Sequence, residues 1–561
     1  MRRTSLLLVS LIAALSILIA GCGASPPQSA ATTAPEAPAA TTAPEAPAAS
    51  GPVTIRLFTP QAPEIDLPTN SFTLEAQERF GIQFEFQTTT YDGTSARETR
   101  QISLASGDYP DAYMLIPWVD QFSQTELIRY GQQGVLLPLN DLIAQHAPNI
   151  QAALDEYPYF RAMATAPDGK IYGLPQLSEC YHCSFPNKVW INTKWLDQLG
   201  LEMPTTTEEF RQVLTAFKEQ DPNGNGQADE VAFSGSTEEY GVRPLPFLMN
   251  GFIYNDDRTY LLLNGGKVDI AATKDGWREG LAYAKSLYDA GLIDPGAFTQ
   301  NAEALRQIGN NADVQLLGAA AGMHPAIFVG IGSDAPYGSD YNPLPPLEGP
   351  NARFATYNYP IAPGATFALT NKASPEVQVA AIRLVDYMFT QEGQIRAHFG
   401  EEGVDWRRPE PGDVANEEGV EPILAAIPLE EGETPRNTSW GAVAQYFQPK
   451  AFRDAWVQST DIYASVGYER RLQEATNLYN GNQPAEVFPH WAIWIDPAVA
   501  DEVATLRTNI TDYINQNALQ FVTGTRDLDT EWDAYVAELE QLGLPRYLEL
   551  MQQAYDAAFP S

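Results

Sequence analysis

Alternating apolar and polar positions predict two short strands near the start of the folded sequence, at residues 53–57 and 82–86. One helical stretch, residues 71–80, lies between them, and a second ends at Gly107. The more continuously apolar run YPDAYMLIPW, residues 109–118, predicts a third strand. Strands that alternate with helices indicate a parallel sheet covered by helices.

Helical spacing dominates the later part of the chain. It predicts a helix from Asp275 with Trp277 on its buried face, and another in which the Ser374 hydroxyl caps the first turn. Residues 440–561 are helical and rich in aromatic side chains, with Asp529 as the predicted cap of one helix. These stretches are interpreted as packing elements.

A capped helix precedes an unusual loop. Thr206 and Glu209 have the spacing of a capping box, in which each side chain accepts a hydrogen bond from the backbone N–H of the other residue. Apolar residues then repeat on one helical face until the helix ends at Asp221.

The loop at residues 221–230 has the spacing of a site for a hard cation. Oxygen-bearing side chains occupy positions 1, 3, 5 and 9 of a calcium-binding loop, Gly226 is at position 6, and Gln227 offers its carbonyl at position 7. Position 12 is Ala232, which cannot supply the usual bidentate carboxylate, so Glu230 would have to complete the shell. A turn rich in Asn and Gly is the alternative.

Two segments carry a family resemblance: WINTKWLDQLGLEMPTTTEEF, residues 190–210, and DPNGNGQADE, residues 221–230. They resemble the solute-binding lipoproteins of ABC importers, of the maltodextrin-binding type and in particular its longer algino-oligosaccharide-binding relatives. The resemblance implies an α/β, two-lobed periplasmic-binding-protein-like fold of type II, in which each lobe is a mixed sheet flanked by helices, with a helix-rich C-terminal segment. It also implies a structural Ca²⁺ held by Asp221, Asn223, Asn225, Gln227, Asp229 and Glu230.

The predicted organisation has four parts. Residues 1–21 are a signal peptide, residues 22–51 a lipid-anchored Pro/Ala/Thr linker, residues 52–175 plus 356–405 the first lobe, and residues 176–355 plus 406–561 the second lobe. An apolar run and the lipobox Ile19-Ala20-Gly21-Cys22 indicate acylation of Cys22, with an uncleaved anchor as the alternative. The predicted location is the outer face of the cytoplasmic membrane.

Six residues are candidates for solute binding: Trp118, Asp120, Glu179, His324, Trp406 and Arg407. Trp118 and Asp120 follow the third predicted strand, and ligands of parallel α/β sheets lie beyond the carboxyl ends of the strands. The resemblance implies that Glu179, just after the first crossing between lobes, faces the cleft, and it gives His324 a similar place. Trp406 and Arg407 lie at a later crossing. Burial in the core is the alternative for the two tryptophans and for His324.

Charge and cysteine content narrow the class of partner. The formal net charge is −37, which disfavours nucleic acid and anionic membrane surfaces. Cys180 and Cys183 are the only cysteines besides Cys22, and outside the cytoplasm they favour a local disulfide. A metal site that includes His182 is the alternative.

The predicted function is capture of a small solute, most simply an oligosaccharide, by a non-enzymatic monomeric lipoprotein that delivers it to ABC permease subunits. A surface glycoside hydrolase, which needs two facing carboxylates, is one alternative. A lipoprotein that presents its ligand to a membrane sensor is another. No nucleophile elbow, HExxH motif or P-loop supports turnover.

Overall fold

The computed structural model describes residues 51–238, 241–332, 335–359, 363–429 and 433–560. The predicted signal peptide, Cys22 and most of the linker therefore lie outside the described residues. Among the helices of the described part, none is long and apolar enough to cross a membrane.

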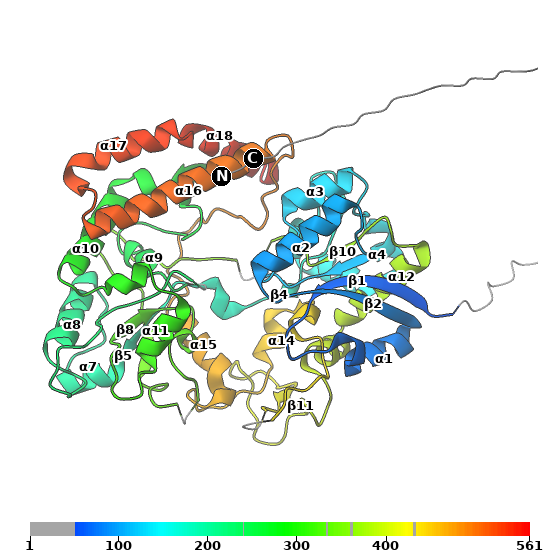
Figure 1. Cartoon of the computed structure of the whole chain (residues 1–561), viewed down its shortest axis with the longest axis horizontal. Helices are drawn as coiled ribbons and strands as arrows, with labels where there is room; N and C mark the ends of the chain where they lie inside the picture. Colours follow the sequence, from blue (N-terminus) through cyan, green and yellow to red (C-terminus); the bar gives the residue numbers. More distant parts are fainter. Residues whose placement is uncertain (1–50, 239–240, 333–334, 360–362, 430–432, 561) are drawn as a thin grey trace, which may run out of the picture. The chain divides into compact units, whose positions relative to one another are not determined.

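A four-stranded mixed sheet, in the order β10-β3-β1-β2, organises the first of the two largest hydrophobic cores of the described residues (Figure 1). Strand β1 (Val53–Pro60) is parallel to β2 (Ile82–Thr89) and to β3 (Ala112–Met114), whereas β10 (Phe367–Leu369) is antiparallel to β3. Helices α1 (Ser71–Phe80) and α2 (Gly93–Ser106) connect the parallel strands. The predicted alternation of strands and helices in this region is confirmed.

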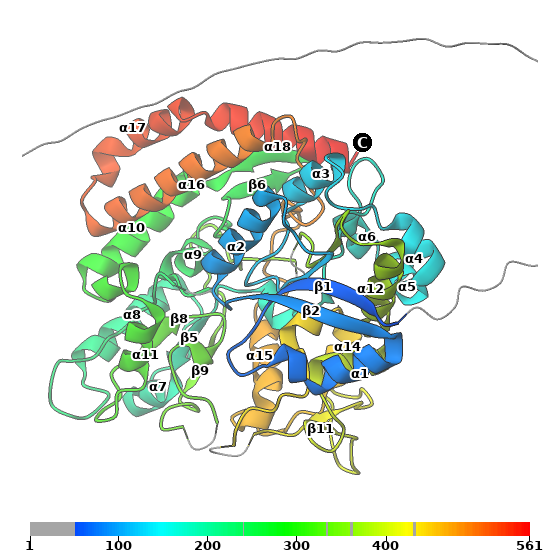
Figure 2. The ribbon, with the colours of Figure 1, turned by 45° about the vertical axis from the view of Figure 1, so that its right-hand side comes forward.

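Helix α12 (Pro375–Met388) covers one side of this core and contacts β1. The Ser374 hydroxyl accepts a hydrogen bond from the Val377 N–H, as the sequence predicts. Figure 2 shows α12 beside α4 (Asn140–His146) and α5 (Pro148–Glu156), which it contacts. Further helices of this region are α3 (Gln124–Gln132), α6 (Pro158–Ala164) and the short α13 (Gln391–Gln394).

The second core is built on an antiparallel sheet in the order β8-β5-β9. The strands are β5 (Val189–Asn192), β8 (Ala319–Ala321) and β9 (Tyr341–Leu344). The helices around it include α7 (Thr193–Leu199), α8 (Thr207–Glu219), α9 (Pro244–Met249), α10 (Asp275–Asp289) and α11 (Ala302–Gly309). A separate hairpin pairs β6 (Leu261–Asn264) with β7 (Lys267–Ile270).

The capping box at the start of α8 is present. The Thr206 hydroxyl accepts a hydrogen bond from the Glu209 N–H, and the Glu209 carboxylate accepts one from the Thr206 N–H. Trp277 on α10 is only 2% exposed, which confirms its prediction as a core residue.

Three C-terminal helices pack on the second core: α16 (Ala500–Thr523), α17 (Leu528–Gln541) and α18 (Leu544–Ala558). Figure 1 shows them together above α10, and α16 contacts α10 directly. The predicted cap Asp529 is wrong, because the Asp527 carboxylate accepts the N–H groups of Asp529 and Thr530. Two aspartates only two positions apart could not be ranked as caps by residue type alone.

One segment departs from the predicted lobe boundaries. Trp440 and Tyr446 lie in the predicted second lobe, but both are buried in the first core. The Trp440 Nε1–H donates to Thr73 Oγ1 at 2.8 Å. A helical, aromatic-rich composition shows that side chains will be buried, but not which core they fill.

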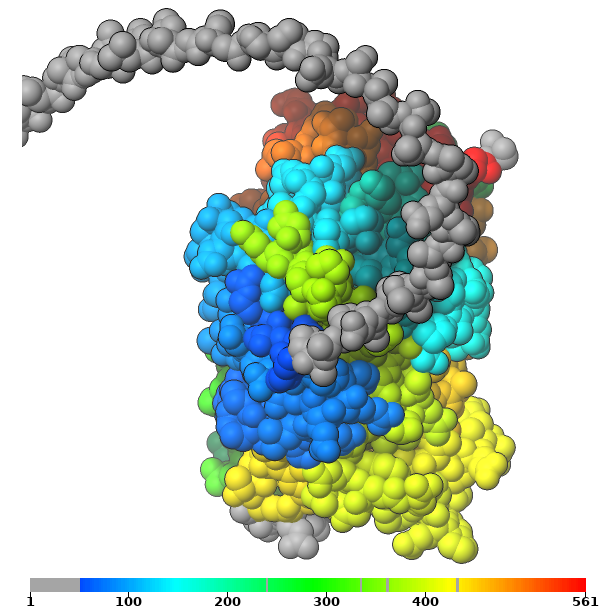
Figure 3. Space-filling view, turned by 90° about the vertical axis from the view of Figure 1, so that its right-hand side faces the viewer, coloured from blue at the N-terminus to red at the C-terminus, as the bar shows by residue number. Residues whose placement is uncertain are grey.

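Asn437, just before Trp440 in the chain, contacts the start of α1. Asn70 Nδ2 donates to Asn437 Oδ1 at 2.9 Å, and the Ser71 N–H donates to the Asn437 carbonyl at 3.1 Å. Figure 3 shows the corresponding yellow surface beside the blue N-terminal surface. Residues 437–446 therefore pack on the first core, whereas the three C-terminal helices pack on the second.

Candidate functional site

Glu179 lies where the chain passes between the two cores. It follows β4 (Leu177–Ser178), which pairs in parallel with β13 (Phe447–Gln448). Its carboxylate accepts a hydrogen bond from the Tyr159 hydroxyl at 2.7 Å and another from the Lys450 backbone N–H at 2.6 Å. Glu179 therefore connects α6 of the first core to the start of α14 (Lys450–Asp454).

Three aromatic rings form a row that begins at the Glu179 contact. The Tyr159 and Tyr359 ring centres are 5.1 Å apart, and Tyr359 stacks on Trp491 with ring centres 4.5 Å apart. All three side chains are half-buried, so part of each remains accessible to a ligand. A row of partly exposed rings beside a carboxylate suits the apolar faces and hydroxyl groups of a sugar.

Of this group, only Glu179 is predicted from the sequence as a solute contact. Tyr359 and Trp491 are 132 residues apart in the chain, so no local spacing relates them. The aromatic run HWAIW, residues 490–494, was the available signal. It was assigned to packing with the rest of the C-terminal segment.

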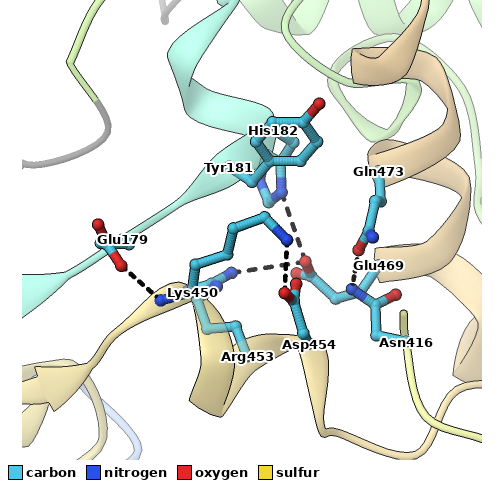
Figure 4. A pocket seen from close by; sticks show the side chains of 9 residues that line it. All are labelled: Glu179, Tyr181, His182, Asn416, Lys450, Arg453, Asp454, Glu469 and Gln473. Atoms are coloured by element: carbon cyan, nitrogen blue, oxygen red, sulfur yellow. Dashed lines mark hydrogen bonds and ion pairs between the residues drawn. The ribbon is translucent and has the colours of Figure 1, made fainter. Parts of the chain in front are cut away.

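A small polar pocket adjoins Glu179 (Figure 4). It is lined by Glu179, Tyr181, His182, Asn416, Lys450, Arg453, Asp454, Glu469 and Gln473. Lys450 pairs with Asp454, and Arg453 pairs with Glu469 at 3.4 Å. The lining charges are thus largely satisfied within the wall, which suits a role in holding α14 against α15 (Tyr468–Asn477).

Glu469 is the charged centre of this wall. His182 Nδ1 lies 3.4 Å from Glu469 Oε2, the same carboxylate oxygen that Arg453 contacts. Burial raises the pKa of Glu469, but the hydrogen bonds and charges of His182 and Arg453 outweigh this effect and lower the pKa to about 2. Glu469 is therefore ionised at neutral pH.

A disulfide joins Cys180 to Cys183 in the turn that follows Glu179. His182 lies between the two cysteines, with Nε2 3.4 Å from Cys180 Sγ. The three side chains are close enough to hold a metal ion. The disulfide, however, takes up both sulfurs, and metal binding requires free thiolates.

Trp118 and Tyr91 form an exposed aromatic pair at the carboxyl ends of β3 and β2. Trp118 is 61% exposed, which excludes the alternative that it packs in the core. Tyr91 is 38% exposed, and burial raises the pKa of its hydroxyl while the neighbouring Trp118 side chain partly offsets this effect. Trp118 lies where ligands of parallel sheets bind, and Tyr91 extends its surface.

The prediction that Asp120 contacts solute is corrected by the structure. Its side chain has no exposed surface, and Arg100 Nε lies 2.6 Å from its carboxylate. Arg100 itself is only 1% exposed and also pairs with Glu126. The carboxylate of Asp120 therefore holds α2 to the strand ends instead of facing a ligand.

Trp406 and Arg407 form β11 and are both half-buried. Trp406 packs against a small cluster that contains Ile395, and its Nε1–H donates to the Gly400 carbonyl at 3.2 Å. Arg407 pairs with Asp413 at 2.6 Å. Both side chains are only half-buried, so their solute contact stays a prediction.

His324 is half-buried, as the core alternative anticipates. Its ring packs edge-on against Tyr468, with centres 6.2 Å apart. Burial, followed by the nearby charges of His182 and Lys188, lowers the pKa of His324 to about 4. His324 is therefore neutral at pH 7, and its buried Nδ1 has no hydrogen-bond partner among the described residues.

The loop at residues 221–230 gathers oxygen atoms at the end of α8. Asp221 has a left-handed backbone, with φ of 48°, and its carboxylate accepts the N–H groups of Asn225 and Gly226. The Asn223 and Asn225 amides both donate to Asp229. These contacts fold the loop inward around its own side chains.

The hydrogen bonds of this loop do not include the Glu230 carboxylate. Both of its carboxylate oxygens are buried without a hydrogen-bond partner among the described residues. Burial raises the pKa of Glu230, and the charges of Asp221 and Asp229 raise it further. An unpartnered carboxylate beside two others fits a cation site better than a simple turn.

Two α/β cores joined by crossing segments, with partly exposed aromatic residues at the junction, are typical of a binding protein of the periplasmic type. Bacterial extracellular solute-binding proteins match the chain over residues 73–400, and the chain belongs to this family. The fructooligosaccharide ABC transporter substrate-binding protein FusA of Streptococcus pneumoniae is 30% identical over 509 residues, which cover 87% of each chain.

Solved structures of solute-binding proteins share the fold of this chain. FusA in complex with kestose superimposes with a TM-score of 0.69 at 26% identity, over 90% of this chain and 99% of FusA. An EF-hand mutant of FusA in complex with fructo-nystose gives a TM-score of 0.68, also at 26% identity and the same coverage. A solute-binding protein from Bifidobacterium longum infantis, described as binding HMO, shares the fold with a TM-score of 0.73 at 20% identity, over 91% of this chain and 99% of that chain. The predicted type II fold is confirmed.

Proposed function

We propose that this protein captures an oligosaccharide outside the cell and delivers it to an ABC importer. The similarity to FusA, which extends over 87% of both chains, carries this proposal. The accessible rings of Tyr359 and Trp491, beside Glu179, provide suitable chemistry at the junction of the cores. Aromatic rings stack on the apolar faces of sugars, and carboxylates accept their hydroxyl groups.

Capture would proceed by closure of the two cores about the segments that connect them. Hinged closure around a ligand requires only a few residues to absorb the rotation, and it excludes water from the polar contacts. The first lobe would comprise residues 52–175 and 356–405, with the Trp440 segment added to it, and the second lobe the rest. Trp118, at the strand ends of the first core, would then meet the solute from one side.

The family and its relatives favour binding over catalysis. Titration calorimetry of the purified protein with kestose, fructo-nystose and unrelated saccharides tests the proposal, with chromatography of the sugar afterwards. We expect at least one saccharide to bind and to be recovered intact. Recovery of cleaved sugar would support the glycoside hydrolase alternative, and binding of peptides but no saccharide would overturn the proposal.

The loop at residues 221–230 would hold Ca²⁺ through Asp221, Asn223, Asn225, Gln227, Asp229 and Glu230. The unpartnered oxygens of Glu230 support this assignment, together with the EF-hand named in FusA. A bound Ca²⁺ would offset two of the three carboxylate charges and fix the end of α8, which is a structural role.

The leader sequence supports export and acylation of Cys22, which would tether the protein to the outer face of the cytoplasmic membrane. The membrane partner would be the permease subunits of the importer, and the protein would act as a monomer. Mass spectrometry of the mature protein tests the acylation directly. A free or missing Cys22 would contradict it.

A further inference from the structure

The dipeptide His490-Trp491 connects the two cores beside the aromatic row. Trp491 packs against the first core and stacks on Tyr359, with ring centres 4.5 Å apart. His490 packs on Phe488, a residue of the second core, with ring centres 4.8 Å apart. A solute bound at this dipeptide would therefore contact both cores.

One edge of the His490 ring is held by two oxygen atoms. Nε2 lies 3.3 Å from Asp256 Oδ2 and 3.2 Å from Thr259 Oγ1. The Thr259 hydroxyl already donates its proton to Asp256, so it offers only lone pairs to the histidine. Both neighbours are acceptors, and Nε2 must therefore carry the proton.

The opposite edge of the ring is available. The His490 side chain is 34% exposed, and Nδ1 has no hydrogen-bond partner among the described residues, nor is it one of their buried unpartnered atoms. In the neutral ring with a protonated Nε2, Nδ1 is an acceptor. The Trp491 Nε1–H likewise has no described partner and is not buried, so an acceptor and a donor lie on adjacent residues.

The loop that holds His490 is strained. The Asp256 carboxylate accepts the N–H groups of Arg258, Thr259 and Tyr260, at 3.0, 2.9 and 2.6 Å. Within the same loop, Asp257 and Tyr260 have left-handed backbones, with φ of 64° and 60°. A left-handed tyrosine is unfavourable, and such strain clusters at functional sites.

We propose that His490 and Trp491 form a saccharide subsite, in which His490 Nδ1 accepts a hydrogen bond from a sugar hydroxyl and the Trp491 ring or Nε1–H contacts the same sugar unit. Asp256 is the positioning residue, because it fixes the ring orientation and keeps the proton on Nε2. The subsite selects a neutral, hydroxyl-rich unit, since an acceptor nitrogen beside a buried carboxylate disfavours an anionic group. This inference rests on the proposed function of oligosaccharide capture.

Two substitutions of His490 separate a ligand contact from a structural one. In His490→Gln, the side-chain amide reaches the position of Nε2 and can still donate to Asp256, but the acceptor at Nδ1 is lost. In His490→Asn, the shorter amide places an oxygen near the Nδ1 position, and the contact with Asp256 is lost. A structural role predicts that Gln is the better replacement, and a sugar contact predicts that Asn is.

Calorimetry with kestose, or with the tightest binder of the saccharide panel, measures the difference. We expect His490→Gln to weaken binding at least tenfold while its thermal midpoint stays close to that of the wild type. We expect His490→Asn to retain at least threefold more affinity than His490→Gln. Any other order, including equal affinities, would overturn the subsite.

A ligand-free measurement tests the positioning. Nitrogen-15 NMR of the histidine rings should show His490 protonated at Nε2 and bare at Nδ1, and the Nδ1 shift should move when the sugar is added. The opposite tautomer would overturn the proposal regardless of affinity. If the wild-type protein binds no saccharide, the proposed function itself fails, an outcome distinct from saccharide binding that His490 variants leave unchanged.

Discussion

The Tyr159 hydroxyl donates a hydrogen bond to Glu179 across 2.7 Å, at the point where the chain leaves the first core. The ring of the same tyrosine lies against Tyr359 at 5.1 Å. Tyr159 therefore holds the carboxylate of the crossing segment and also begins the aromatic row. Stability and solute binding should depend on the same contact.

Replacing Glu179 with Gln should destabilise the crossing segment. The glutamine oxygen can accept from Tyr159 or from the Lys450 N–H, but its amide group then faces the other donor. We expect the free energy of unfolding to fall by about 1–3 kcal/mol, measured by urea unfolding. Tyr159→Phe, which removes only the hydroxyl, should cost less. Unchanged stability in both variants would show that the Tyr159–Glu179 hydrogen bond does not stabilise the crossing segment.

Trp118→Ala should weaken saccharide binding with little effect on folding. Its side chain is 61% exposed, and surface substitutions change stability by only about 0.5 kcal/mol. We expect calorimetry to show at least a tenfold loss of affinity at a nearly unchanged thermal midpoint. The buried Trp277 provides the control, since Trp277→Ala should cost about 3–5 kcal/mol. Equal losses of stability in the two variants would place Trp118 in the core.

Asp120→Ala should lower stability and leave saccharide binding nearly unchanged, the reverse of Trp118→Ala. The substitution leaves Arg100 buried, with Glu126 as its remaining ion-pair partner. Breaking a buried ion pair typically costs about 3–5 kcal/mol, and chemical unfolding would measure it. Saccharide affinity of the folded fraction should remain close to that of the wild type. A selective loss of affinity would restore the predicted role of Asp120 in binding.

Chelation of calcium should lower the thermal midpoint. Ligand present at 100 times its dissociation constant stabilises a protein by about 2.7 kcal/mol. We expect a chelator to destabilise the wild type and to have little further effect on Glu230→Gln. The matched control is Glu219→Gln, an exposed residue at the end of α8 that should respond to chelation like the wild type. No response to chelation in the wild type would identify the loop as a turn.

Lys188 should make stability increase with pH above neutrality. Its ammonium group is fully buried and donates to the His182 and Phe185 carbonyls, and burial lowers its pKa to about 7. The unfolded chain, with a lysine pKa of about 10.4, binds more protons between these values, so the free energy of unfolding rises with pH across that window. Below pH 7 Lys188 is protonated in both states, so its contribution to the free energy of unfolding no longer changes with pH.

Urea unfolding at pH 7 and pH 9 tests this dependence. The wild type should gain more stability between the two values than Lys188→Met, because methionine cannot titrate. The slope from one such group is at most about 1.4 kcal/mol per pH unit. Identical slopes in the two proteins would show that Lys188 remains protonated in the folded state.

Features that depend on residues close together in the chain could be predicted from the sequence. The capping box of Thr206 and Glu209, the cap of α12 at Ser374 and the strand and helix order of the first sheet depend on residues a few positions apart. The same holds for the oxygen spacing of residues 221–230, which requires only one continuous loop. Hydrogen-bond geometry and side-chain period link these residues within one turn or strand.

Only the tertiary structure decided which distant side chains meet. Asp120 is buried because Arg100 turns toward it from α2, and Trp440 fills the first core although its neighbours in sequence gave no such indication. The pairing of His490 with Asp256, 234 residues away, has the same origin. Burial and long-range contacts are set by how complete elements pack, which has no period along the chain. The sequence therefore determined the elements and the loop, and the packing determined the binding surface.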